Sequence, residues 1–141
     1  MSFPKAKFSQ WYHWDNRGSM PNRKYPGVYL LARFKGRCPK IVNHRGKNVV
    51  YIGETCRKEG EGLLTRWRQF ERAVKKNEKG HSGGLTYRKH FGGNFEDLYV
   101  SAWPVTDIQG DRASSLIRCV ERKLLWDYVE RWERYPKCNK M

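Results

Sequence analysis

Apolar residues recur along this chain with two different periods, and each period predicts a different kind of element. The run GVYLLARF at 27–34 is almost continuously apolar and rich in β-branched and aromatic residues, which predicts a mostly buried strand. The segments 48–52 and 97–103 predict two further strands on the same grounds. The interval 35–47 is punctuated by glycine and proline, and we expect it to form a long hairpin excursion between the first two strands.

Helical spacing appears in the remaining apolar segments. Between 62 and 77 the apolar residues lie three and four positions apart, as on one face of an amphipathic helix. The longest stripe of this kind follows Asp111, the expected helix cap, and ends before Pro136. Glycines at 80, 83 and 84 predict a break in the chain, after which we expect a short helix over 85–91.

The order strand, strand, helix, helix, strand, helix predicts the α+β class, with a small three-stranded antiparallel sheet flanked by helices. A chain of 141 residues is long enough for one domain with a single core. We assign residues 1–26 to an aromatic and basic N-terminal arm and 27–141 to the domain, with the basic hairpin at 35–47 as an insertion.

The net charge of the chain indicates its partners more than its fold. The chain has 29 Lys and Arg against 14 Asp and Glu, a formal net charge of +15, which favours polyanionic partners such as nucleic acid or an acidic membrane surface. No apolar run approaches the roughly 20 residues of a spanning helix, and the N-terminal segment lacks the apolar stretch of a secretory signal. The four cysteines are scattered without a Cys-x-x-Cys pair, which indicates reduced thiols in a cytoplasmic protein.

Five short motifs occur along the chain in an order that indicates a common functional site. GVY at 27–29 lies in the first predicted strand, and YIG at 51–53 ends the second. Arg66 lies early on the following helix, Glu121 lies in the last helix, and a Pro-x-x-Asn closes the pattern at 136–139. Each motif alone is weak, but together they resemble the signature of the GIY-YIG nucleases over roughly residues 27–139.

The resemblance implies a DNA endonuclease that hydrolyses phosphodiester bonds with one Mg²⁺ or Mn²⁺ ion per active site. It implies that Glu121 binds the ion, that Arg66 binds the non-bridging phosphate oxygens, and that Tyr29 is the general base while Tyr51 orients the water or the phosphate. Such a base needs a neighbouring cation, because a phenol has a pKa near 10. The expected catalytic set is Tyr29, Tyr51, Arg66, Glu121 and Asn139. Gly27 and Gly53 are expected at structural turns.

This chain departs from the family pattern where members carry His or Tyr one helical turn after the arginine, because that position is Phe70. Tyr87 and His90, on the short helix, are the candidates we name to supply the missing hydrogen-bonding group. Glu54 follows the YIG motif, and we interpret it as a partner in a loop salt bridge in preference to a metal ligand. We assign no role to the remaining histidines, which are His13, His44 and His81.

We expect the DNA-binding surface to consist of exposed cations on the excursion and on the first predicted helix. These are Lys35, Arg37, Lys40, Arg45, Lys47, Arg68 and Arg72. No zinc finger, helix-turn-helix or second domain is evident, so the chain resembles a compact restriction-type or phage-type enzyme more than a two-domain homing or excision-repair enzyme. Cleavage of both strands would require a homodimer or successive nicks.

Two alternatives remain open at this stage. One is a non-catalytic nucleic-acid-binding module derived from a nuclease fold, which only Phe70 favours. The other is a ribosomal or RNA-binding protein, which would account for the charge and the aromatic residues but not for the order of the motifs.

Overall fold

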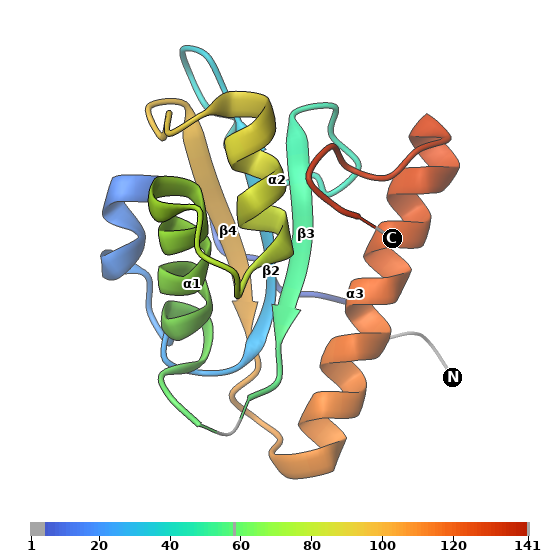
Figure 1. Cartoon of the computed structure of the whole chain (residues 1–141). Coiled ribbons are helices and arrows are strands. Elements are labelled where there is room, and N and C mark those ends of the chain that lie inside the picture. Colours follow the sequence, from blue (N-terminus) through green and yellow to red (C-terminus); the bar gives the residue numbers. More distant parts are fainter. Residues whose placement is uncertain (1–4, 58, 141) are drawn as a thin grey trace.

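The computed structural model describes residues 5–57 and 59–140, and it has a four-stranded antiparallel sheet in the order β1-β4-β2-β3 with helices on both faces (Figure 1). The elements in chain order are β1 (Tyr12–His13), η1 (Trp14–Ser19), β2 (Gly27–Arg33), β3 (Val49–Thr55), α1 (Gly62–Lys76), α2 (Ser82–Phe91), β4 (Leu98–Pro104) and α3 (Gly110–Trp132). The prediction of the α+β class is confirmed, and the sheet has one strand more than the three that the sequence predicted.

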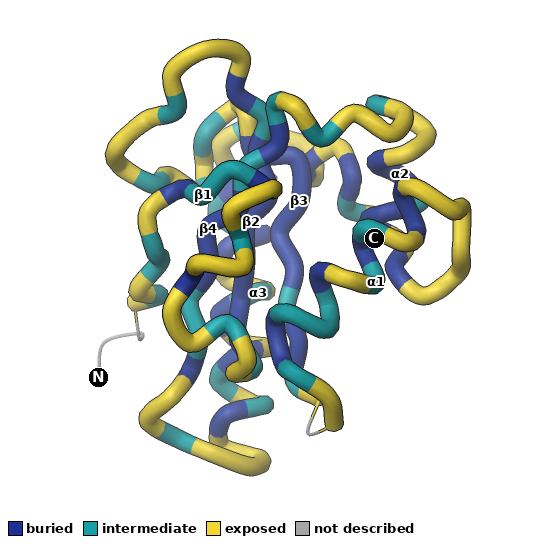
Figure 2. Tube along the Cα trace, turned by 90° about the vertical axis from the view of Figure 1, so that its left-hand side faces the viewer, coloured by how far each residue is buried: buried dark blue, intermediate teal, exposed yellow. Residues whose placement is uncertain are grey.

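Strand β2 is central and is buried on both faces, which explains its continuous hydrophobicity. Alternate residues point to opposite sides of the sheet, so Tyr29 and Leu31 face α1 and α2, whereas Val28 and Leu30 face α3. The tube in Figure 2 shows the strands as the buried centre and the connections as the exposed periphery. Two apolar cores therefore lie back to back across the sheet.

The N-terminal arm contributes to this core rather than standing apart from it. Residues Tyr12–His13 pair with β4, with Tyr12 opposite Val100, and Trp11 and Trp14 are both buried. A two-residue strand gives no recognisable period, which is why the sequence did not predict it. The buried aromatic residues of the arm are consequently not available to stack on nucleic-acid bases.

Helix α2 begins at Ser82, three residues before its predicted start, and it includes two of the glycines that we took for a break. A Cβ atom at Gly84 would lie 2.8 Å from the carbonyl oxygen of Phe70, so glycine allows α2 to pack directly on α1. Tertiary packing thus overrides the local preference of glycine for turns. Asp111 lies in the first turn of α3, whose N-cap is Gln109.

The excursion at 35–47 connects β2 to its antiparallel neighbour β3, as predicted for a hairpin. Its second half is anchored on α3, where the indole Nε1 of Trp132 donates to the carbonyl oxygen of Arg45 at 2.7 Å. His44 Nε2 also lies 2.9 Å from a carboxylate oxygen of Asp127. Within the described part of the chain, no helix is both long and apolar enough to cross a bilayer.

Candidate functional site

Tyr29 and Tyr51 come from adjacent strands and share one face of the sheet. In the β2–β3 register Tyr29 lies opposite Gly53 and Leu31 lies opposite Tyr51, so the two tyrosines are diagonal neighbours. Their ring centroids are 5.9 Å apart. Tyr29 is fully buried, whereas Tyr51 retains a small exposed edge that lines a cavity.

Gly53 makes room for this tyrosine pair. A Cβ atom at Gly53 would lie 2.9 Å from Cζ of Tyr29 and nearer still to the ring of Tyr51. The prediction that Gly27 and Gly53 form turns is wrong, because both lie within strands, and neither has a positive φ. At Gly27 a side chain would instead collide with the backbone of β4. Both glycines are required for close approach and not for chain reversal.

His81 is the residue that the sequence analysis missed. It is the N-cap of α2, it is buried, and its Nε2 lies 2.8 Å from the hydroxyl oxygen of Tyr29. Its ring also packs edge-on against Phe70, with centroids 5.3 Å apart. A histidine from α2 therefore occupies the space beside Tyr29, and Phe70 supports it. No sequence signal marked it, because the predicted helix began at 85 and His81 lay in the predicted glycine-rich break.

The hydrogen bonds of His81 fix its tautomer. The backbone N–H of Gly84 donates to Nδ1 at 3.0 Å, so this nitrogen carries no proton. Burial and the nearby positive charge of Arg66 lower the pKa of His81 to about 3, and the ring is neutral at ordinary pH. Its one proton is consequently on Nε2, which donates to Tyr29.

Arg66 lies on the first turns of α1 and reaches the site from the side of the helix. Its guanidinium donates to Oε1 of Gln69 and to the carbonyl oxygen of Gly80, both at 2.8 Å. Burial raises the pKa of Tyr29 well above its usual value and also raises that of Tyr51, while the charge of Arg66 opposes both increases. Arg66 is the neighbouring cation that favours a phenolate, but burial outweighs its charge, and the pKa values of both tyrosines remain above the ordinary value.

Glu121 approaches the same site from α3, around the open edge of β3. A cavity of about 570 Å³ is lined by residues of β3, α2, α3 and the C-terminal segment: Tyr51, Ser82, Glu121, Arg122, Tyr135, Asn139 and Lys140. The side chain of Glu121 is 19% exposed, and its nearest cationic partner, Arg122 Nε, is at 3.8 Å. The carboxylate thus remains accessible from the cavity.

The charge environment of Glu121 fits a cation. Burial raises the pKa of Glu121, and the negative charge of Glu54 raises it further. The predicted salt bridge of Glu54 is not formed with any described residue, and its carboxylate instead accepts a hydrogen bond from Cys56 Sγ at 2.9 Å. No group of three or more His, Cys, Asp or Glu forms a metal site among the described residues. Mg²⁺, however, often binds through one or two carboxylates, with water and substrate phosphate completing its shell.

Asn139 binds the backbone of the sheet edge. Its Oδ1 accepts from the N–H of Ile52 at 3.0 Å, and its Nδ2 donates to the carbonyl oxygen of Ile52 at 2.9 Å. Ile52 lies between Tyr51 and Gly53 in β3. The geometry therefore favours a positioning role for Asn139, which holds the strand that carries Tyr51.

Tyr87 and His90 do not reach the tyrosine pair. The Tyr87 hydroxyl donates to the carbonyl oxygen of Asn94, and its ring packs between Phe70 and Phe95 in the core. His90 is exposed on the last turn of α2. His81 takes the position that we had sought for one of these two residues, because it lies at the opposite end of α2.

The expected DNA-binding cations fall into two groups. All five on the excursion are exposed, and none forms an ion pair with a described acidic residue: Lys35, Arg37, Lys40, Arg45 and Lys47. On α1, Arg68 pairs with Glu61 at 2.8 Å and Arg72 with Glu78 at 3.8 Å. These ion pairs leave the α1 cations less available to phosphates than those of the excursion.

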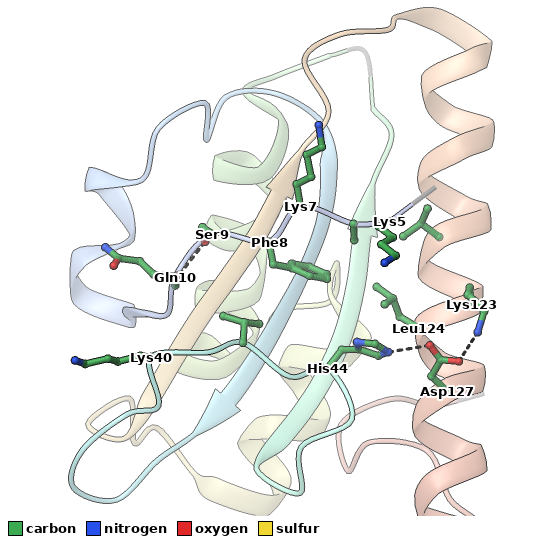
Figure 3. A pocket seen from close by; sticks show the side chains of 13 residues that line it. Lys5, Lys7, Phe8, Ser9, Gln10, Lys40, His44, Lys123, Leu124 and Asp127 are labelled. Atoms are coloured by element: carbon green, nitrogen blue, oxygen red, sulfur yellow. Dashed lines mark hydrogen bonds and ion pairs between the residues drawn. The ribbon is translucent and has the colours of Figure 1, made fainter. Parts of the chain in front are cut away.

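A separate cavity of about 790 Å³ lies between the arm, the excursion and α3 (Figure 3). Phe8 and Leu124 contribute to its apolar wall, and Asp127 bridges His44 and Lys123 at its rim. Figure 3 shows Lys40 pointing away from this ion-pair network. None of the predicted catalytic residues lines this cavity, so it is distinct from the candidate site.

Comparison of this chain with protein-family models, with curated proteins and with solved structures finds no match.

Proposed function

We propose that this protein is a metal-dependent DNA endonuclease that hydrolyses phosphodiester bonds. The observation that carries the proposal is the convergence of two phenols, a guanidinium and an accessible carboxylate at the edge strand β3. These groups come from four elements: Tyr29 on β2, Tyr51 on β3, Arg66 on α1 and Glu121 on α3. Core packing alone does not require this combination of polar groups.

Each residue has a role that follows from its chemistry. Arg66 binds the non-bridging oxygens of the phosphate through its planar set of donors. Glu121 would hold the divalent ion, which when bound supplies Lewis-acid stabilisation of charge on the phosphate and on the leaving oxygen. Tyr51 lines the cavity and orients the water or the phosphate.

Tyr29 is the proposed general base. The water enters beside Tyr51, because Tyr29 itself is fully buried. In the proposed step Tyr29 first loses its phenolic proton to solvent. The attacking water then gives a proton to the Tyr29 phenolate, its oxygen bonds to phosphorus, and the leaving sugar oxygen departs and takes a proton from solvent. The N–H of His81 would stabilise that phenolate, together with the charge of Arg66.

The test is incubation of the purified protein with supercoiled plasmid, with Mg²⁺ or Mn²⁺ and with chelator. We expect nicked or linear DNA only with the metal. Glu121→Gln keeps the shape of the side chain and removes the charge, so cleavage should collapse while DNA binding survives. Metal-dependent cleavage by this variant at the normal rate would overturn the role of Glu121.

The alternative of a non-catalytic binding module loses its one supporting feature. Phe70 suggested that a hydrogen-bonding group was missing, but His81 provides one from α2. Plasmid binding without cleavage under every metal condition would favour this alternative. One site cuts one strand at a time, so linear product would imply two copies or two successive nicks.

A further inference from the structure

A second cavity lies beside the candidate active site and is dominated by arginine. It has a volume of about 300 Å³ and is lined by Glu54, Thr55, Cys56, Arg57, Arg66 and Arg118. The three guanidinium groups come from separate segments, namely the loop after β3, helix α1 and helix α3. Arg66 lines this cavity and not the one that Tyr51 and Glu121 line, but its charge acts on both Tyr29 and Tyr51, so it connects the two sites.

The positive charge of this cavity is not neutralised within the described part of the chain. Arg57 and Arg118 form no ion pair with a described acidic residue. Arg66 donates only to neutral oxygens of Gln69 and Gly80. Glu54 is the one carboxylate in the lining, so three positive charges face one negative charge. Like charges repel unless an anion separates them, and this cavity therefore favours an anionic ligand.

We propose that this cavity, the arginine subsite, binds a backbone phosphate next to the one that is cut. The inference rests on the proposed nuclease function and deepens it. Guanidinium groups bind phosphate oxygens through two parallel hydrogen bonds, and a diester phosphate carries one negative charge. Arg57 and Arg118 would hold this neighbouring phosphate, while Arg66 lies between it and the reacting one.

The two cavities also define a path for the substrate strand. Tyr51, in the middle of β3, lines the candidate active site, and Glu54 and Thr55, at the end of β3, line the arginine subsite. Three to four residues of a strand span about 10 to 13 Å. The bound strand therefore runs along the β3 edge, from the catalytic cavity toward the loop that contains Arg57.

The test compares two double variants in the Glu121→Gln background, which binds without cutting. Arg57→Gln with Arg118→Gln removes the contact to one phosphate, so the slope of log affinity against log salt for a duplex should become shallower by about 0.9. Arg112→Gln with Lys89→Gln is the matched control, because both residues are exposed and line neither cavity. Denaturation midpoints of both variants should equal that of the parent.

A neutral methylphosphonate placed next to the cut position provides the second measurement. It should weaken binding to the parent and leave binding to the Arg57/Arg118 variant unchanged, since that contact is already lost. An unchanged salt slope, together with normal plasmid cleavage by the unmodified protein, would refute the subsite and leave the nuclease function standing. A shallower salt slope for the Arg57/Arg118 variant, together with no plasmid cleavage by the unmodified protein, would establish a nucleic-acid-binding site and refute the nuclease function.

Discussion

A methyl group at Gly53 tests the geometry of the tyrosine pair directly. In Gly53→Ala the new Cβ would lie 2.9 Å from Cζ and 3.0 Å from the hydroxyl oxygen of Tyr29, and it would overlap the ring of Tyr51. Ordinary carbon contacts are about 3.5–4.0 Å, so the rings must move by about 1 Å. Overpacking of this kind costs about 1–3 kcal/mol. Alanine recovers about 0.5–1 kcal/mol over glycine within a strand, which leaves a net loss of about 1 kcal/mol at the centre of the two ranges.

The measurement combines thermal denaturation with plasmid cleavage. For a chain of this size the loss corresponds to a decrease in Tm of about 2–8 °C. The rate of cleavage should fall by more than the loss of folded protein accounts for, because both displaced rings carry hydroxyls of the candidate site. Gly93→Ala is the matched control, since no atom lies within 4 Å of its added Cβ and its φ is not positive. A Gly53→Ala protein with the stability and activity of the parent would refute this arrangement of the rings.

Three further predictions follow from the site and the excursion. The pKa of His81 in the folded protein is about 3, below the ordinary value of 6.5. Acid therefore favours the unfolded chain, in which this histidine binds a proton more readily. Because of this one residue, the free energy of unfolding should fall by about 2 kcal/mol between pH 7.5 and pH 5. His81→Asn keeps an N-cap acceptor but cannot reach Tyr29. The variant should lose less stability in acid than the parent, and the pH profile of cleavage should shift. An identical acid dependence of stability in both proteins would contradict a buried, neutral His81. Arg66→Lys should lose most activity because an ammonium cannot form the planar double contact, and retained activity would reassign Arg66 to a solvated helix face. The five cations of the excursion are Lys35, Arg37, Lys40, Arg45 and Lys47. Replacing all five with Gln in the Glu121→Gln protein should make the slope of log affinity against log salt shallower by up to about 4 to 5. An unchanged slope would show that the excursion does not contact the DNA backbone.

The sequence predicted those parts of the fold that depend on local periodicity. Strand β2 and helix α3 were evident because their apolar residues recur over two or more turns or pleats. The start of α2 was missed because the fit of Gly83 against Tyr51, and of Gly84 against Phe70, is a tertiary requirement that outweighs the turn preference of glycine. Strand β1 was missed because only its pairing with β4 defines it.

The candidate site was predictable where a motif marked it and not where a long-range contact creates it. Tyr29 and Tyr51 could be paired from the sequence because neighbouring antiparallel strands bring them together. His81 could not, since 52 residues separate it from Tyr29 and only the packing of α2 on α1 and β3 joins them. The role of Asn139 could not be predicted either, because the backbone that it binds lies 87 residues earlier in the chain.

The attachment of the C-terminal segment to β3 has a consequence for behaviour in solution. An edge strand offers unpaired N–H and C=O groups that can recruit a strand from another molecule, which is a common route to aggregation. Here the Asn139 amide engages both backbone groups of Ile52, and the N–H of Cys138 donates to the carbonyl oxygen of Val50 at 2.8 Å. A few residues of the same chain thus imitate a fifth strand, and we expect a chain shortened before Pro136 to associate through the edge of β3.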